Sequence, residues 1–267
     1  MRHAASAITA PDSGHLSAYW QFHAAVSRAQ LTTWLPPGRH VVVDVSGPRG
    51  PGAELAARAG HTVLRIVDGS RGGGPGQARW GRAADRQEGY DRTRAWSPGR
   101  IIPVIADPSR LSFLTDSCAD DVIANDRTLS MHIAAEMLIA EIARVLRPAG
   151  RVLACVDSLV LGMAVLADQH HWAQLVDLPN AEVVLVPWPD GSITRCYGPD
   201  QARDLFTGAG LTVNWVRSRT VLSESTVTHL LRRDPNSLPQ LVRAELAARS
   251  DDFLGAQLVI SARKPRR

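Results

Sequence analysis

Two acidic residues and a group of glycines near the start of the chain have the residue types and spacing that bind a sugar. The apolar run Val41–Val45 contains Asp44 and is followed by a loop rich in glycine and proline. A second apolar run, Val63–Val67, ends at Asp68. Glycines let a backbone approach a ligand closely, and a carboxylate at the tip of a buried strand accepts hydrogen bonds from ribose hydroxyls. This pattern predicts a nucleoside-binding site.

The elements that must position these residues are a strand, a loop, a helix and a second strand. A run of β-branched apolar residues is typical of a buried strand, and the alanine-rich segment Ala53–Ala59 predicts a helix that ends at Gly60. In an open α/β sheet, ligands bind beyond the carboxyl ends of the strands. We therefore expect Asp68 and the glycine-rich loop to lie at the same edge of one sheet.

The rest of the chain continues the alternation of strands and helices up to about residue 157. This order favours a doubly wound, mostly parallel sheet, to which the late strands add an antiparallel edge. We expect further strands at 101–106, 121–124, 151–156, 211–216 and 257–262, a hairpin formed by 183–186 and 193–196, helices at 13–35, 129–147, 157–177, 199–208 and near 224–249, and a loop followed by an exposed helix within 69–100.

Bulk composition describes an ordinary globular chain. The 267 residues are 45% hydrophobic and 21% charged, the net charge is +4, and the basic residues are scattered arginines with a single lysine, Lys264. A nucleic-acid surface would need a dense basic stripe interleaved with aromatic residues, so we expect no nucleic-acid partner. The three cysteines have no metal-binding spacing, the N-terminus lacks an apolar signal core, and the longest apolar stretch, Val152–Ala167, is too short to span a membrane. We expect a soluble cytoplasmic protein.

The segment 41–156 resembles the class I (Rossmann-like) S-adenosylmethionine-dependent methyltransferases, in particular those that act on small molecules. Four pieces carry the resemblance in the family's order, namely Asp44–Gly50, Asp68–Ser70, Ala106–Asp107 and Glu141–Leu153. The last piece is the most specific, and its role is structural. The resemblance implies an α/β fold with a seven-stranded, mostly parallel sheet and an antiparallel C-terminal edge.

The resemblance also implies S-adenosylmethionine as the cofactor. Within the implied site, Asp68 would bind the ribose and Asp107 the adenine amino group, whereas Asn125 would face the site of methyl transfer together with Asp126. The cofactor-binding residues that it implies are Asp44, Ser46, Gly47, Gly50, Asp68, Gly69, Asp107, Pro108 and Asn125.

The chain departs from the family pattern in the glycine-rich loop, where Ser46 and Pro48 stand at positions that usually hold glycine. Serine adds a side chain, and proline removes an N–H group and fixes φ. A methyltransferase-like protein that does not methylate is therefore an alternative. An NAD(P)-dependent oxidoreductase is a third hypothesis, because Gly47, Gly50 and Gly52 together with Asp68 also suit a dinucleotide loop. The Tyr-x-x-x-Lys pair of short-chain reductases is excluded, since Lys264 is the only lysine.

Methyl transfer requires alignment of donor and acceptor, and a base helps when the acceptor must lose a proton. The candidate catalytic residues are His132 and Asp126, and His15 or His23 on the N-terminal helix are further candidates for the base. Asp126 and Asp157 follow neighbouring strands and could supply two carboxylates to a metal, but the sequence shows no metal-binding signature and we expect no metal.

We expect three regions along the chain: an N-terminal helical lid (1–38), an α/β core that binds S-adenosylmethionine (39–157), and a C-terminal part (158–267) that completes the sheet and adds substrate-covering segments. The apolar segment Val160–Ala167 and the neighbouring tryptophans Trp172 and Trp188 favour a hydrophobic small-molecule acceptor. The sequence leaves the oligomeric state open, with a homodimer as one option.

Overall fold

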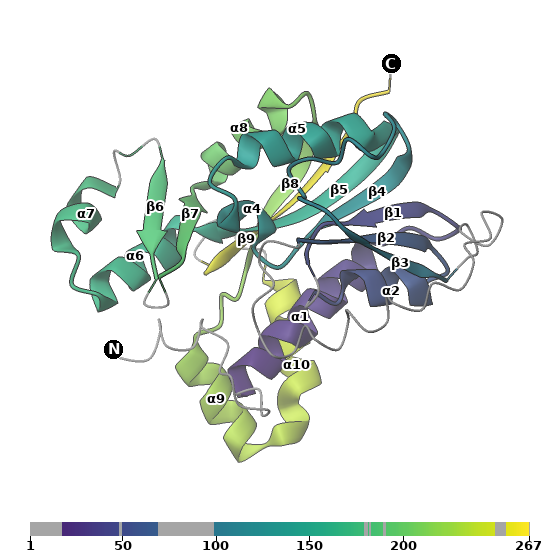
Figure 1. Ribbon diagram of the computed structural model, residues 1–267. Coiled ribbons are helices and arrows are strands. Elements are labelled where there is room, and N and C mark those ends of the chain that lie inside the picture. The colour runs from purple at the N-terminus through teal and green to yellow at the C-terminus, as the bar shows by residue number, and fades with distance from the viewer. Residues whose placement is uncertain are drawn as a thin grey trace.

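The computed structural model describes residues 18–47, 50–68, 99–178, 181, 183–188, 191–248 and 255–266 (Figure 1). The strands are β1 (Val41–Asp44), β2 (Thr62–Val67), β3 (Ile101–Ile105), β4 (Ala119–Ala124), β5 (Leu146–Ser158), β6 (Val184–Pro187), β7 (Ile193–Tyr197), β8 (Thr212–Arg219) and β9 (Gln257–Arg263). The helices are α1 (Ala18–Trp34), α2 (Gly52–Arg58), α4 (Thr128–Met131), α5 (Ala135–Val145), α6 (Leu159–Asp168), α7 (Trp172–Asp177), α8 (Pro199–Gly208), α9 (Glu224–Arg233), the short 3-10 helix η4 (Pro235–Ser237) and α10 (Leu238–Ala247).

The described strands form one sheet in which β3, β2, β1, β4 and β5 lie side by side and run parallel. Strand β9 pairs with β5 in the antiparallel direction and in turn pairs with β8, also antiparallel. This path of seven strands confirms the doubly wound, mostly parallel sheet and its antiparallel C-terminal edge. It brings the carboxyl ends of β1, β2, β4, β5 and β8 to one edge.

The sheet has nine strands, two more than the seven that the resemblance implies, because the predicted hairpin joins it. The two additional strands are the hairpin of β6 and β7, which attaches only at the end of β5, where Asp157 and Ser158 pair with β7. Strand β9 occupies one edge of β5, and β4 stops pairing at Ala154 on the other. The hairpin therefore binds the exposed edge that remains, and it forms a lobe with α6 and α7 (Figure 1).

Both faces of the sheet are covered by helices, as the alternation of elements predicts. Successive residues of a strand point to opposite faces. Val43 and Val152 therefore pack in the cluster that contains Leu138 and Ile142 of α5, whereas Val42 and Leu153 pack with α1 and α2. Each such fully buried Leu or Ile side chain contributes about 1.5–3 kcal/mol to folding. Because both faces are buried, the strands read as continuous apolar runs.

Two predicted helices are interrupted. The helix expected at 129–147 is two helices, α4 and α5, because His132 adopts an extended backbone (φ −103°, ψ 109°) and β5 begins at Leu146. The helix expected at 157–177 begins only after β5, where the hydroxyl of Ser158 accepts a hydrogen bond from Leu161 N and caps α6. A turn with His170 at φ +59° then separates α6 from α7.

The N-terminal helix α1 packs against the late helices of the chain. Tyr19, Phe22 and Val26 form a buried cluster with Val227 and Leu231 of α9. Figure 1 shows α1 between the sheet and the pair α9 and α10. The predicted lid is thus described from residue 18 onward, and the division into three regions stays a prediction. The loop and helix expected within 69–100 lie outside the described residues, apart from Gly99 and Arg100.

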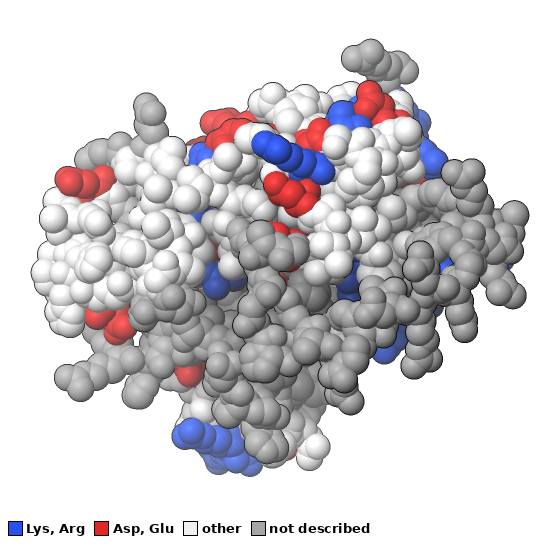
Figure 2. Space-filling view, in the orientation of Figure 1, with Lys and Arg blue, Asp and Glu red and all other residues white. Residues whose placement is uncertain are grey.

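On the surface seen in Figure 2, acidic and basic side chains are interspersed above α5 and α8, and the lobe of α6, α7, β6 and β7 is largely uncharged. This lobe carries large exposed apolar side chains, namely Val160, Met163, Trp172, Val176, Leu185 and Ile193. Within the described part of the chain, no helix combines the length and the apolar character that a membrane span requires.

Candidate functional site

A cavity of about 1000 Å³ lies at the carboxyl edge of the sheet. Its walls come from the ends of β1, β2 and β4, from α1, and from the hairpin of β6 and β7. Of the predicted cofactor residues, six line it: Ser46, Gly47, Gly50, Asp68, Pro108 and Asn125. The predicted catalytic residues Asp126 and His132 line it as well. The sequence therefore locates the cavity, although each residue's role there stays a prediction.

Ser46 ties the end of β1 to the end of β4. Its Oγ accepts a hydrogen bond from Asn125 N at 2.9 Å and lies 3.5 Å from the carbonyl oxygen of Ile123. Its own backbone N–H donates to Asp44 Oδ1 at 2.9 Å. The hydroxyl is thus held by protein groups and does not close the cavity. The side chain that replaces the family's glycine has a structural function here.

Asp44 lies beneath the loop and is not part of the cavity wall. It is fully buried, and burial raises its pKa to about 6 although the hydrogen bonds from Ser46 oppose this. A Cβ on Gly52 would come within 2.8 Å of Asp44 Oδ2, so the start of α2 can lie this close only with glycine there. Gly47 has φ +84°, a conformation that glycine adopts without strain. Asp44 therefore supports the loop from below.

The side of the cavity where the adenosyl group is predicted to bind is bounded by the ends of β2 and β3. Asp68 follows β2 directly and is part of the wall, together with Pro108. Asp107 is exposed, and its Oδ1 accepts hydrogen bonds from both N and Oγ of Ser109, which hold its pKa below the usual value. An aspartate that accepts a hydrogen bond from the backbone two residues later is typical of a turn. Gly69 lies outside the described residues.

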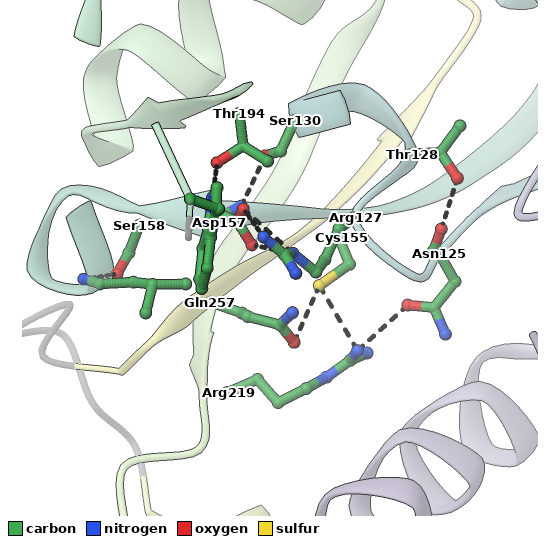
Figure 3. A network of polar contacts seen from close by, with 12 residues as sticks. Asn125, Arg127, Thr128, Ser130, Cys155, Asp157, Ser158, Thr194, Arg219 and Gln257 are labelled. Atoms are coloured by element: carbon green, nitrogen blue, oxygen red, sulfur yellow. Dashed lines mark hydrogen bonds and ion pairs between the residues drawn. The ribbon is translucent and has the colours of Figure 1, made fainter. Parts of the chain in front are cut away.

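Asn125 is the most strongly connected of the predicted residues. It is 1% exposed, its Nδ2 donates to Ser27 Oγ of α1 at 3.0 Å, and its Oδ1 accepts from Arg219 Nη1 of β8 at 3.1 Å. It therefore joins three elements that are distant in sequence, and Figure 3 shows Arg219 pointing toward it. The amide is fixed by protein groups on both sides.

Next to Asn125, two successive residues have left-handed backbones, Asp126 at φ +59° and Arg127 at φ +65°. The guanidinium of Arg127 makes a bidentate pair with the buried Asp157, at 2.9 and 3.1 Å from Nε, and lies over the ring of Trp188. Asp157 therefore offers no free carboxylate to a metal. Throughout the described residues, no group of three metal-ligating side chains occurs.

His132 lies on the predicted adenosyl side of the cavity, close enough to Asp107 to lower the pKa of that carboxyl. Its Nδ1 is 2.8 Å from the carbonyl oxygen of Thr128. A carbonyl oxygen only accepts, so Nδ1 carries the proton in the neutral ring, and Nε2 is the nitrogen that can take up another.

His23 lies on the opposite side of the cavity, in a polar cluster that includes Gln257, Cys155 and Arg219 (Figure 3 shows the last three). Its Nε2 is 3.0 Å from Gln257 Oε1, which also accepts from the thiol of Cys155. Burial, together with the nearby Arg219 guanidinium, lowers the pKa of His23 to about 4. His23 is therefore neutral at neutral pH.

The sequence prediction missed Arg219, Gln257 and Thr194 in the cavity wall. Arg219 ends one strand and Gln257 begins the next, and polar residues at such positions are common in any sheet. They become candidate site residues only because the fold places them at the same edge of the sheet as Asp68. The predicted substrate-covering segments do contribute Leu161 and Trp188 to the wall. Trp172, in contrast, is not among the residues that line it.

Comparisons with known proteins show the fold and no close sequence relative. No family profile matches the chain, and no curated protein sequence matches it. Solved structures do match over most of the chain. An S-adenosylmethionine-dependent methyltransferase from Mesorhizobium loti has 16% identity and a TM-score of 0.55, over 90% of this chain and 98% of its own.

Two further structures show the range of proteins with this architecture. The 1,6-didemethyltoxoflavin-N1-methyltransferase of Burkholderia thailandensis, solved with its substrate and S-adenosylhomocysteine, has 18% identity and a TM-score of 0.55 over 92% of this chain and 81% of its own. The cyclase SpnF has 18% identity and a TM-score of 0.53, over 97% and 86%. The fold of this chain is that of the class I S-adenosylmethionine-dependent methyltransferases.

Proposed function

We propose that this protein is an S-adenosylmethionine-dependent methyltransferase with a small-molecule acceptor. The observation that carries the proposal is the cavity, which joins the predicted adenosyl side at Asp68 and Pro108 to an apolar side at Leu161 and Trp188. Its volume of about 1000 Å³ is at the upper end for small-molecule sites, which accommodates a cofactor and a compact acceptor together.

The residues present fit the cofactor. Gly47 and Gly50 border the cavity without side chains, Ser46 directs its hydroxyl to protein groups, and Asp68 follows β2 at the sheet edge where a ribose would bind. When bound, the cofactor supplies an electrophilic methyl group, so the protein mainly has to align the acceptor and exclude water. His132 through Nε2, or Asp126, is the proposed proton acceptor.

Calorimetry on the purified protein tests this function. We expect S-adenosylhomocysteine to bind and NADPH not to bind. Asp68→Asn should weaken S-adenosylhomocysteine binding about tenfold or more, because a charged acceptor of ribose hydrogen bonds is lost. Asp116→Asn, a change to an exposed acid paired with Arg144, is the matched control and should leave binding unchanged. Binding of NADPH alone would instead favour the oxidoreductase.

A protein that uses this fold without methyl transfer is the second candidate. It is favoured by the cyclase SpnF, which has the same architecture. If neither S-adenosylhomocysteine nor NADPH binds the wild-type protein, this second candidate is favoured. If S-adenosylhomocysteine binds the wild-type protein and the Asp68→Asn variant equally well, Asp68 is not part of the site.

A further inference from the structure

Arg219 is a buried cation that forms no ion pair with any residue that the structure describes. The residue is 1% exposed and forms part of the cavity wall. Its Nε donates to Gln30 Oε1 at 2.7 Å, and its Nη1 donates to Asn125 Oδ1 and to Cys155 Sγ. All three partners are neutral, and Nη2 has no hydrogen-bond partner in the described structure.

The other buried arginine of the same cavity provides the contrast. Arg127 is paired with both carboxylate oxygens of Asp157. A buried cation without a counter-charge costs free energy, and its loss of hydration is recovered only through an anion or strong hydrogen-bond acceptors. Arg219 thus lacks the partner that Arg127 has.

Arg219 lies at a different part of the cavity from the predicted adenosyl side. It ends β8, which in the sheet is divided from β1 by β9, β5 and β4. The predicted adenosyl contacts follow β2 and β3, at the other end of the same edge. Around Arg219, the wall is formed by His23, Gln257 and Thr220, with the aromatic side chains of α1 nearby.

We propose that Arg219 binds an anionic oxygen of the acceptor, such as a carboxylate or an ionised enol, beside Asn125 and Gln257. This inference rests on the proposed function, because the term acceptor presupposes a cofactor on the Asp68 side. A guanidinium recognises a carboxylate through paired N–H donors, and Nη2 is a donor that remains for it. The acceptor is then a small apolar or aromatic molecule with one acidic group.

The test uses the full-length protein saturated with S-adenosylhomocysteine, and two probes of the same shape, benzoate and benzamide. We expect benzoate to bind about tenfold or more tightly than benzamide, the difference that a charge-assisted hydrogen bond makes. Arg219→Gln should abolish this preference. Arg217→Gln is the matched control, because Arg217 lies on the same strand but is exposed and stacked on Trp215.

Equal binding of the two probes to the wild-type protein, or binding of neither, overturns the proposal. So does a preference for benzoate that survives in Arg219→Gln. If Arg219→Gln does not unfold cooperatively, and so is not folded, Arg219→Lys replaces it in the test. This variant keeps the charge and should keep part of the preference for benzoate over benzamide.

A second comparison separates the two sources of a carboxylate. S-Adenosylhomocysteine carries one, whereas methylthioadenosine has the same nucleoside without it. We expect Arg219→Gln to leave the ratio of their affinities unchanged. A loss confined to S-adenosylhomocysteine would assign Arg219 to the cofactor and overturn the acceptor assignment. If the wild-type protein binds no S-adenosylhomocysteine, the proposed function fails. Benzoate and benzamide, added in the absence of S-adenosylhomocysteine, then still test the anion site at Arg219.

Discussion

The two edges of the central sheet, at the amino ends and the carboxyl ends of its parallel strands, differ in how their buried charged side chains are paired. At the amino end, the fully buried Asp121 lies between His40 and Arg151, and Arg151 also stacks over Trp34 at 4.8 Å. At the carboxyl end, the hydrogen-bond partners of Arg219 among the described residues are all neutral. The charge of Asp121 is thus compensated within the protein, whereas Arg219 forms no ion pair with a described residue.

This difference separates a structural cluster from the proposed binding site. In a doubly wound sheet, the carboxyl edge is where loops diverge and ligands bind, whereas the amino edge has a purely structural function. An uncompensated charge at the carboxyl edge is therefore a property that a ligand can use. The same charge at the amino edge would only reduce stability.

The largest effect should follow from Asp121→Asn. This change leaves Arg151 without its carboxylate partner and should lower the free energy of unfolding by about 2 kcal/mol, since Arg151 is one-third exposed and partly hydrated. Urea denaturation measures the loss. Affinity for S-adenosylhomocysteine, measured well below the melting temperature, should not change. A loss of affinity with unchanged stability would contradict a purely structural role for the amino end.

A smaller effect is expected from Ser46→Gly at the carboxyl end. The change removes the acceptor of the buried Asn125 N–H and adds backbone entropy to the unfolded chain, so it should cost about 1–2 kcal/mol. It should not raise the affinity for S-adenosylhomocysteine, because the hydroxyl contacts protein groups. Ser46→Ala separates the lost hydroxyl from the added flexibility. A gain in affinity would show that Ser46 does obstruct the cofactor site.

The smallest effect concerns His23 and pH. Its pKa is lowered from 6.5 to about 4 in the folded protein. Between these values the unfolded chain takes up a proton at His23 that the folded chain excludes, so stability is lost as the pH falls from 6.5 toward 4. The melting temperature of His23→Gln should therefore fall less over this range than that of the wild-type protein. Parallel curves would contradict the lowered pKa.

Much of the fold could be predicted because its signals are local. The strands β1 and β2 are short apolar runs, and Gly60, which follows α2, marks a boundary that neighbouring residues alone define. The predictions failed where longer contacts decide the structure. The 129–147 helix breaks at His132, and β5 runs on to Ser158 because the β6 and β7 hairpin pairs with its end. No local pattern contains these pairings.

The position of Asp68 at the tip of a buried strand followed from the order of residues along the chain, because a strand and the loop after it are adjacent in sequence. The partners of Ser46 and Arg219 were decided only by the tertiary structure. Ser46 meets Asn125 across 79 residues, and Asn125 meets Arg219 across 94. These contacts arise from the order of strands in the sheet, which brings distant strand ends to one edge. Whether a polar side chain there is satisfied or still lacks a partner depends on that convergence.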